Sequence, residues 1–510
     1  MLDILRKIKR KFINNTLDKT LNPQYQGILF SILRILFQTR RFYRIIYKYR
    51  SGDITSIYTI FQKYKPKNIF EKRLKSRIEE MHLILLKGWP EDEIRKSYPV
   101  EFNHRIIFVI HNSLPHDGAG YAIRSHNILN HLKQHNINPL AVTRLNYPWD
   151  LKQHSDKPWE DNSRVDHITY NRITDNSVSI GGKESEYIQR YGDKLAEIAK
   201  KHSAPLIHAA SNYLNGLAAA RAAHSVNGKS IYEVRGMWHW SRAIKEPYFQ
   251  DSDSQTYCEI MEKAAVQGVD HIITISQGLK NLLLKWGIPQ NKITVVPNAV
   301  DTDIFQPIDK DRQLKNHLGL GNRLIIGFIG TLTHYEGLDL LIRASSDLIQ
   351  EGFRISLLIV GKGIAYDHLM SLSKSLSGKN HIHFRGYVPY QEVHRYYSII
   401  DIFPFPRQNY NVCRIVPPLK IFEVMAMAKP VIVSKLPALE EIIEDGSNGL
   451  LSEPDNYKKL KDTLVRLIED KNLRLQTGLL AREYVCKYHN WSKSAQKYSD
   501  IYKNVCASSV

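Results

Sequence analysis

The stretch NVCRIVPPLKIFEVMAMAKPVIVSKLPALEEIIEDGSNG, residues 411–449, decides the fold of this chain. Pro417 and Pro418 end an extended segment, because proline fixes φ and lacks an N–H, and proline also suits the first position of a helix. Residues 420–427 are mostly good helix formers, so we expect a helix there. The apolar, β-branched residues 430–434 predict a buried parallel strand, after which a short helix and a glycine turn follow.

Lys420 and Glu423 are three residues apart, so they share one face near the N-terminus of the predicted helix. A carboxylate and an ammonium group at such a place can bind a ribose diol and a phosphate together. The alternative is a glutamate that caps the helix beside a solvated lysine. These two residues alone leave both interpretations open.

The same stretch resembles the signature region of glycosyltransferase family 4, in the subgroup with the motif P-L-K-x-x-E-x-M-A-x-x-K-P-V. The resemblance implies a nucleotide-sugar-dependent, retaining enzyme with the GT-B fold, in which Glu423 holds the ribose hydroxyls of the donor. Many members carry an earlier glutamate that contacts the donor sugar, and Ile415 occupies that position here. We therefore expect this protein to recognise the sugar differently.

Length and composition indicate a globular protein of more than one domain. A chain of 510 residues exceeds the usual single-domain size, and 43% hydrophobic and 24% charged residues exclude a disordered chain. The cysteines are scattered and show no metal-ligand spacing, so we expect reduced thiols in a cytosolic protein and neither disulfides nor a zinc site. The cysteines are Cys258, Cys413, Cys486 and Cys506. We expect no cofactor and no required metal, with a nucleotide-diphosphate sugar as co-substrate.

The N-terminal region carries much of the net charge of +20, since residues 1–80 hold 19 Lys and Arg against 6 Asp and Glu. Residues 1–12 form an amphipathic basic pattern, and residues 27–37 are apolar but too short to span a bilayer. No nucleic-acid-binding motif accompanies the charge, so we expect no nucleic acid partner. We expect this extension to dock on the anionic inner face of the cell membrane; a small helical bundle with a solvated basic side is the alternative.

From Arg105 the pattern alternates between strands and helices. Residues 105–110 predict a buried strand, followed by a loop with Gly118 and Gly120 and then a helix. Such a loop lets backbone N–H groups approach a diphosphate, although a tight turn explains the glycines equally well. The resemblance implies that both glycines lie against the donor phosphates. Arg124, one turn into the helix, is either an anion or acceptor contact or a surface residue.

Further strands in the first domain predict a doubly wound sheet, whose ligands bind at the carboxyl ends of its strands. His208, Asn212 and Arg235 lie at such ends, and Trp238 follows on an aromatic, basic loop suited to acceptor sugars. Family members often have H-x-H near His208, but the second position here is Ala210. His208 is therefore either a catalytic-pocket residue or a core histidine.

Residues 292–305 resemble the interdomain segment V-x-P-N-G-V-D-x-x-x-F of the family and mark the hinge. The second domain then opens with a strand that ends at Gly330. Thr331 and Glu336 stand where most relatives carry an arginine and a lysine that neutralise the diphosphate. The charge must come from elsewhere, and by motif Lys420, Arg414 and Arg407 are the nearest candidates.

The motifs and the resemblance predict three sets of functional residues. The expected catalytic residues are Lys420, Glu423 and His208. The expected donor-binding residues are Gly118, Gly120, Gly330, Thr331, Glu336, Gly386, Tyr387, Val388, Arg414, Lys420 and Glu423, with residues 386–388 matching the segment that holds the nucleobase. The expected acceptor-binding residues are Arg124, Asn212, Arg235 and Trp238.

Together these features predict an α/β protein with the GT-B fold: two doubly wound Rossmann-like domains facing a cleft, with an N-terminal helical extension. The expected divisions are 1–100, 101–303, 304–485 and a helix in 486–510 that returns to the first domain. The expected activity is transfer of a sugar from a nucleotide-diphosphate donor to a glycan or lipid-linked acceptor in cell-surface polysaccharide or glycolipid synthesis. A sugar-nucleotide epimerase and a non-catalytic subunit that recruits a partner to the membrane are the alternatives.

Overall fold

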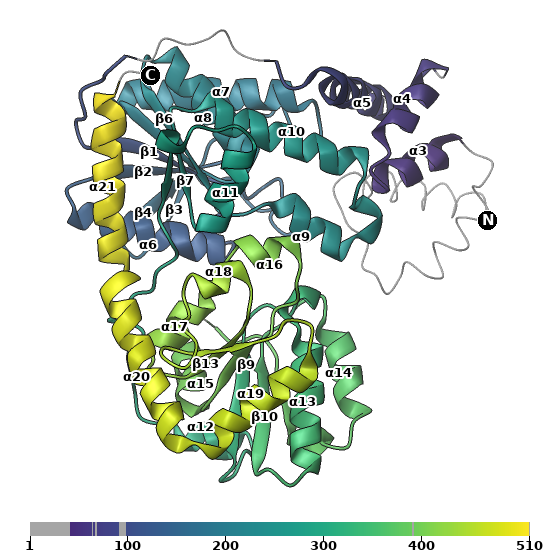
Figure 1. The fold of residues 1–510 in the computed structure, drawn as a ribbon. Coiled ribbons are helices and arrows are strands. Elements are labelled where there is room, and N and C mark those ends of the chain that lie inside the picture. The colour runs from purple at the N-terminus through teal and green to yellow at the C-terminus, as the bar shows by residue number, and fades with distance from the viewer. Residues whose placement is uncertain (1–40, 64, 67–68, 91–97, 390–391, 509–510) are drawn as a thin grey trace.

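The computed structural model describes residues 41–63, 65–66, 69–90, 98–389 and 392–508. The amphipathic and apolar segments expected in 1–12 and 27–37 lie outside these ranges. Figure 1 shows two α/β lobes, one above the other, with a group of helices beside the upper lobe. The expected GT-B architecture is confirmed.

The described part of the N-terminal extension contains helices, as predicted, and packs on the first lobe. It contains α3 (Arg41–Arg50), α4 (Ile54–Gln62) and α5 (Ile69–Lys87). Ile54, Ile57 and Phe61 of α4 are buried in a core that is shared with the first lobe. From α5, Arg77 forms an ion pair with Glu184 at 3.1 Å. The described part of the extension is therefore docked on the first lobe.

The first lobe is built on an eight-stranded sheet with the order β3-β4-β2-β1-β5-β6-β7-β8, in which every neighbouring pair is parallel except β3 and β4. The strands are β1 (Arg105–Ile110), β2 (Asn138–Thr143), β3 (Asn162–Val165), β4 (Ile168–Asn171), β5 (Leu206–Ala210), β6 (Lys229–Val234), β7 (His271–Thr274) and β8 (Ile293–Val295). The helices are α6 (Gly120–Gln134), α7 (Glu184–His202), α8 (Tyr213–Ser225), α9 (Trp238–Lys245), α10 (Asp253–Gly268) and α11 (Gln277–Lys285), with 3₁₀ turns η2 (Pro247–Phe249) and η3 (Gln290–Lys292). The central strands are buried on both faces, which explains their continuous apolar sequences.

The second lobe contains two three-stranded parallel sheets, β11-β10-β9 and β12-β13-β14, that a bridge between Ile326 and Ile402 connects. The strands are β9 (Leu324–Ile329), β10 (Ile355–Val360), β11 (Ile382–Arg385), β12 (Phe403–Phe405), β13 (Val431–Ser434) and β14 (Leu450–Ser452). The helices are α12 (Arg312–His317), α13 (Leu338–Gln350), α14 (Tyr366–Lys374), α15 (Val393–Ile399), α16 (Asn411–Ile415), α17 (Lys420–Ala426), α18 (Pro437–Glu440), α19 (Tyr457–Glu469) and α20 (Lys471–Tyr488), with η4 (His334–Glu336) and η5 (Lys379–His381).

The chain returns to the first lobe at its C-terminal end. Helix α20 packs on α17 of the second lobe, and α21 (Trp491–Ala507) then packs on α6 of the first, so the two last helices together connect the lobes. At the hinge, Val300 N donates to His489 O at 2.9 Å. None of the described helices has the length and apolar character that a bilayer crossing requires.

The deciding stretch folds largely as expected, with one correction. Helix α17 begins at Lys420 and β13 begins at Val431, close to the predicted positions. The prediction of an extended segment before the prolines is wrong for residues 411–415, which form the short helix α16. Only Val416, directly before Pro417, is extended, because a residue that precedes proline avoids the helical region.

Candidate active site

Lys420 lies across the end of β9. A Cβ atom built on Gly330 would be 1.8 Å from Lys420 Nζ, so a side chain at position 330 would occupy the space that the lysine fills. Gly330 also has a φ of +152°, which side chains rarely adopt. Nζ lies 5.0 Å from the centroid of the Phe328 ring. Because Gly330 has no side chain, the Lys420 side chain can lie at the carboxyl end of β9.

The Lys420 ammonium group contacts the Phe328 ring but has no hydrogen-bond or ion-pair partner among the described residues. Burial lowers the pKa of Lys420, an effect that the nearby carboxylates of Glu336 and Glu423 partly offset. A desolvated cation without a partner favours an anionic ligand, because such a ligand replaces the lost solvation.

Glu423 lies one turn further along α17 and is half-buried. Its Oε2 accepts a hydrogen bond of 2.6 Å from the hydroxyl of Tyr397 on α15. Burial raises the pKa of Glu423, against the effects of this hydrogen bond and of Lys420. Among the described residues, Oε1 accepts no hydrogen bond, so this oxygen is free to accept one from a ligand.

Glu336 and Arg407 form a buried pair beside Lys420. Arg407 Nε lies 3.7 Å from Glu336 Oε2, and Nη1 donates to the carbonyl of Val416 at 2.7 Å. Burial opposes the charged form, but Glu336 raises the pKa of Arg407 above its usual value. Arg407 therefore neutralises Glu336 and supports the segment before α17.

Two other predicted donor residues of the second lobe lie at the surface. Arg414 is exposed and donates to Asn409 Oδ1 at 2.9 Å, and Thr331 is exposed after Gly330. Of the three cations expected to replace the missing charge, Lys420 is therefore the one without a hydrogen-bond or ion-pair partner in the described structure.

The loop after β11 lies at the same edge of the sheet. Gly361 N donates to the carbonyls of Arg385 and Gly386, and Gly330 N donates to Val360 O at 2.8 Å. The structure thus brings Gly386 to the same edge as Gly330. The following residues, Tyr387 and Val388, are respectively exposed and half-buried, which leaves their backbone within reach of a ligand.

The glycine loop of the first lobe contacts this region of the second lobe. A Cβ atom on Gly120 would lie 3.2 Å from Cδ1 of Leu419, the residue directly before Lys420. The loop is held by Asp117, which accepts hydrogen bonds of 2.9 Å from Ala119 N and from Asn112 Nδ2. Gly118 is exposed and has no neighbouring atom within 4 Å of a built Cβ. Gly120 is thus adjacent to the expected donor site, whereas Gly118 has open space around it.

The expected roles of Arg124 and His208 are wrong. Arg124 is 2% exposed, and its guanidinium donates to Glu233 Oε1 at 2.7 Å and to Tyr498 OH at 2.8 Å. His208 is fully buried, with Nδ1 at 2.8 Å from Tyr502 OH. Both side chains lie beneath α21, which returns to the first lobe and covers them, so neither can touch an acceptor or a reacting atom.

The other acceptor candidates differ in their availability. Arg235 donates to Glu233 Oε2 and Ser125 Oγ, both at 2.6 Å, so protein groups use most of its donors. Asn212 precedes α8, and its buried Oδ1 has no hydrogen-bond partner among the described residues. Trp238 begins α9 and is half-buried. Asn212 and Trp238 remain candidates for the acceptor side.

Sequence reasoning missed three residues that touch the site. Tyr397 has no local signal, because its contact with Glu423 joins α15 to α17. Asn298 Nδ2 donates to Pro417 O at 2.9 Å, and Ser276 Oγ donates to Ile415 O at 2.5 Å, both across the lobes. Asn298 stands in the hinge motif, so the motif itself could have pointed to it.

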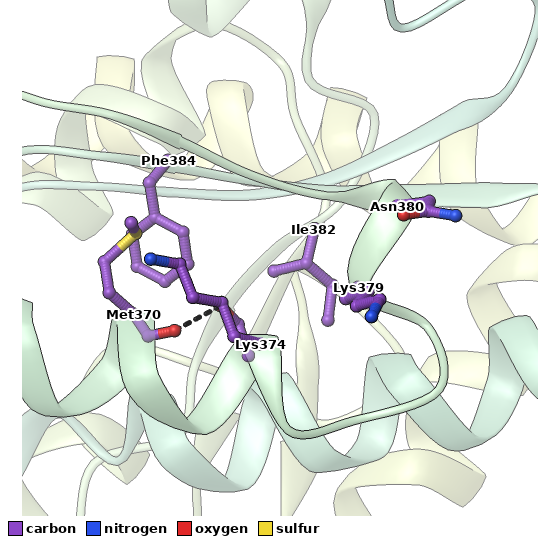
Figure 2. A pocket seen from close by; sticks show the side chains of 7 residues that line it. Met370, Lys374, Lys379, Asn380, Ile382 and Phe384 are labelled. Carbon is purple, nitrogen blue, oxygen red and sulfur yellow. Dashed lines mark hydrogen bonds between the residues drawn. The ribbon is translucent and has the colours of Figure 1, made fainter.

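A separate cavity of about 330 Å³ lies between α14 and β11. Figure 2 shows Met370, Lys374 and Phe384 on one side of it, with Lys379 and Asn380 beyond Ile382. Lys379, Asn380 and Ile382 stand at the start of β11, at the strand end opposite Gly386. This cavity is not part of the candidate site. Within the described ranges, no group of three or more His, Cys, Asp or Glu side chains is arranged to hold a metal ion.

Two family models match most of the chain. The model described as Glycosyltransferase Family 4 matches residues 120–304, and the model described as Glycosyl transferases group 1 matches residues 309–484. Their boundary falls at the hinge between the lobes. The N-terminal extension and α21 lie outside both matches.

Curated relatives and solved structures agree with these matches. An uncharacterized glycosyltransferase of Methanocaldococcus jannaschii is 25% identical over 52% of this chain and 67% of its own length. A D-inositol 3-phosphate glycosyltransferase of Corynebacterium aurimucosum is 24% identical over 54% of this chain and 69% of its own. Sucrose-phosphate synthase of Thermosynechococcus elongatus has a TM-score of 0.65 at 19% identity, covering 79% of this chain and 98% of that one. The chain belongs to glycosyltransferase family 4 and is a glycosyltransferase with the GT-B fold.

Proposed function

We propose that this enzyme transfers a sugar from a nucleoside-diphosphate donor to a hydroxyl of a saccharide or lipid-linked saccharide, with retention of the anomeric configuration. The observation that carries the proposal is the pair on α17: the ammonium of Lys420 over Gly330, which has no hydrogen-bond or ion-pair partner among the described residues, and the free carboxylate oxygen of Glu423. The ammonium suits the diphosphate, and the carboxylate suits the two ribose hydroxyls.

Similar proteins support this class of donor. Solved structures of Anabaena HepE contain UDP or UDP-glucose, with TM-scores of 0.61 and 0.60. A mannosyltransferase of Mycobacterium tuberculosis, 24% identical over 46% of this chain, is named as GDP-mannose-dependent. UDP- and GDP-sugars are therefore the first donors to test.

The proposed reaction uses the diphosphate itself as the base. The bond between the anomeric carbon and the phosphate oxygen breaks while the acceptor oxygen bonds to that carbon on the same face, and the acceptor proton passes to the departing phosphate. Lys420 stabilises the negative charge that develops on the diphosphate, and Glu423 holds the ribose in register. No protein side chain acts as nucleophile. The facing lobes exclude water, which would otherwise hydrolyse the donor.

The charges beside Lys420 also bear on the kind of donor sugar. Lys420 and Arg407 lie beside Glu336 and Glu423, so the four charges balance before a ligand binds. A uronic acid would add a carboxylate to the two phosphates without a further free cation. A neutral sugar is the better fit.

We also propose that the enzyme works at the cytoplasmic face of the cell membrane in cell-surface polysaccharide or glycolipid synthesis. The basic N-terminal region supports this placement. On the described part of it, α5 exposes Ile69, Leu83 and Leu86, which lie on the same helical face as the exposed Lys72 and Arg73. Apolar side chains beside cations suit an anionic lipid surface.

A donor panel tests the activity. Wild type, Glu423→Ala and Lys420→Met are incubated with UDP-, GDP- and TDP-sugars and lipid-linked acceptors, and release of the nucleoside diphosphate is measured. Turnover by wild type with at least a hundredfold loss in both variants is expected. Glu453→Ala, which removes an exposed carboxylate of the same lobe, is the control that retains activity.

Two results would change the proposal. Undiminished turnover by Glu423→Ala would remove the role of Glu423. Nucleotide binding without turnover on any donor and acceptor would favour the non-catalytic subunit.

A further inference from the structure

The segment that leads into α17 is held by three side chains. The carbonyl oxygens of residues 415, 416 and 417 each accept one side-chain hydrogen bond. The donors are Ser276 Oγ at 2.5 Å, Arg407 Nη1 at 2.7 Å and Asn298 Nδ2 at 2.9 Å. Because Pro417 and Pro418 have no N–H, these carbonyls provide much of the segment's hydrogen bonding.

Two of the three donors belong to the first lobe. Ser276 is the residue before α11, and its Oγ also accepts from Leu279 N at 3.1 Å. Asn298 follows β8 in the hinge motif and is 3% exposed. The first lobe therefore holds the segment that places Lys420 at the start of α17, although Lys420 itself belongs to the second lobe.

The second lobe holds the first in return. Glu441, directly after α18, accepts hydrogen bonds of 3.0 Å from Gln277 N and from Gly278 N at the start of α11. A Cβ atom on Gly278 would be 3.1 Å from Ile415 Cα, so the lobes are in direct backbone contact here. These contacts exist only while the lobes are together.

The orientation of the Asn298 amide is fixed from behind. Arg124 Nη1, which is a donor only, lies 3.0 Å from Asn298 Oδ1, so Nδ2 must face Pro417 O. The backbone carbonyl oxygen of Asn298 is also 2.9 Å from His489 Nδ1. Arg124, which was expected to contact the acceptor, thus fixes the orientation of the Asn298 side-chain amide that donates to Pro417 O before α17.

We propose that Asn298 and Ser276 are positioning residues for the sugar transfer: from the first lobe they hold α17 where Lys420 and Glu423 meet the donor, so that the donor site is complete only when the lobes are together. This inference rests on the proposed function. By reciprocity, a nucleotide that binds the completed site stabilises the closed arrangement of the lobes.

Two variants test this role, of which Asn298→Asp is isosteric, whereas Ser276→Ala also removes the acceptor for Leu279 N. In Asn298→Asp, an oxygen replaces the NH₂ group that donates to Pro417, while the acceptor for Arg124 remains. Ser276→Ala removes the donor to Ile415. The matched control is Asn448→Asp, because Asn448 is 5% exposed and donates to Ile442 O at 3.0 Å within the second lobe alone.

Three measurements on the full chain decide the question. UDP and GDP affinity is measured by calorimetry, amide hydrogen exchange is followed in the peptide over residues 420–426, and the radius of gyration is measured by small-angle scattering with and without nucleotide. For Asn298→Asp and Ser276→Ala we expect about tenfold weaker nucleotide binding, faster exchange in that peptide and a larger radius that nucleotide reduces. Asn448→Asp should match wild type in all three.

The outcomes are separable. Wild-type affinity and wild-type exchange over 420–426 in Asn298→Asp would overturn the positioning role while the proposed function stands. Absence of turnover by wild type on every donor would overturn the proposed function. In that case, exchange and scattering still decide whether the two residues hold α17.

Discussion

Lys420 and Gly330 compete for one space in the second lobe: the lysine ammonium fills the space that a side chain on the glycine would take, 1.8 Å from a built Cβ. Gly330→Ala should therefore displace Lys420 from the end of β9. We expect nucleotide affinity to fall at least tenfold, because the free cation leaves the diphosphate position. Calorimetric titration with UDP and GDP measures the change.

Gly268→Ala is the control for that substitution. Gly268 ends α10 in the first lobe, and a Cβ there would meet only Ala220 Cβ at an ordinary 3.7 Å. Its nucleotide affinity should equal that of wild type. Equal affinity in Gly330→Ala as well would show that Lys420 does not bind the diphosphate.

The charge state of Lys420 predicts a pH dependence of nucleotide binding. Burial lowers the pKa of Lys420 below its usual value, and the charges that face it are Glu336, Glu423 and Arg407. As pH rises through the lowered pKa, the ammonium is lost and affinity should fall, at lower pH than for a solvated lysine at about 10.4. Between these two pKa values the unfolded state binds more protons, so stability of the free protein should rise with pH there.

Proton uptake gives a direct measurement. The bound diphosphate raises the pKa of Lys420, so binding in this window should take up a proton, seen as a dependence of the binding enthalpy on the ionisation enthalpy of the buffer. Lys420→Arg keeps its charge and should show no such uptake. The same alkaline profile in both proteins would assign the titration to another group.

Parts of the site that depend on local sequence were predictable. The prolines before α17, the glycines at strand ends and the hinge motif can each be recognised within a few residues of sequence. The structure places three of the residues so identified, Lys420, Gly330 and Gly386, at one edge of the sheet. The sequence alone did not show which cation replaces the lysine that most relatives carry at the position of Glu336. In the structure Arg407 neutralises Glu336, so Lys420 is left without an ion-pair partner among the described residues.

Long-range contacts account for the errors. Arg124 and His208 looked accessible at the end of a sheet, but Tyr498 and Tyr502, at the far end of the chain, cover them when α21 returns. The contact of Tyr397 with Glu423 likewise joins two helices of the second lobe. No pattern in a window of sequence reports which distant helix packs over a residue.

The buried pair of Arg124 and Glu233 should matter for stability and not for substrate contact. Arg124 is 2% exposed and Glu233 is fully buried, and the cations around Glu233 hold the pKa of its carboxyl well below its usual range, against the effect of burial. Arg124→Met removes one of the cations that balance the buried negative charge of Glu233, so we expect a loss of about 3–5 kcal/mol in the free energy of unfolding. Urea denaturation followed by circular dichroism measures it.

An exposed ion pair in the same lobe is the comparison. Arg221 and Asp193 are joined at 3.2 Å, with side chains 39% and 43% exposed. Arg221→Met should change stability by less than about 1 kcal/mol. A similar small effect in Arg124→Met would mean that the buried network does not hold α21 to the first lobe.

The exposed face of α5 makes the membrane proposal testable. Leu83 and Leu86 are 51% and 70% exposed, on the extension whose basic residues outnumber its acidic ones. In the full chain, Leu83→Ser with Leu86→Ser should weaken sedimentation with phosphatidylglycerol vesicles about tenfold, because the apolar contribution to docking is lost while the charge is kept. Leu475→Ser with Leu479→Ser, in a comparably exposed pair on α20, should bind as wild type does. Equal binding by all three proteins would exclude this face of α5 as the docking surface. If wild type bound phosphatidylcholine vesicles as strongly as phosphatidylglycerol vesicles, the proposed role of the basic charge would be contradicted.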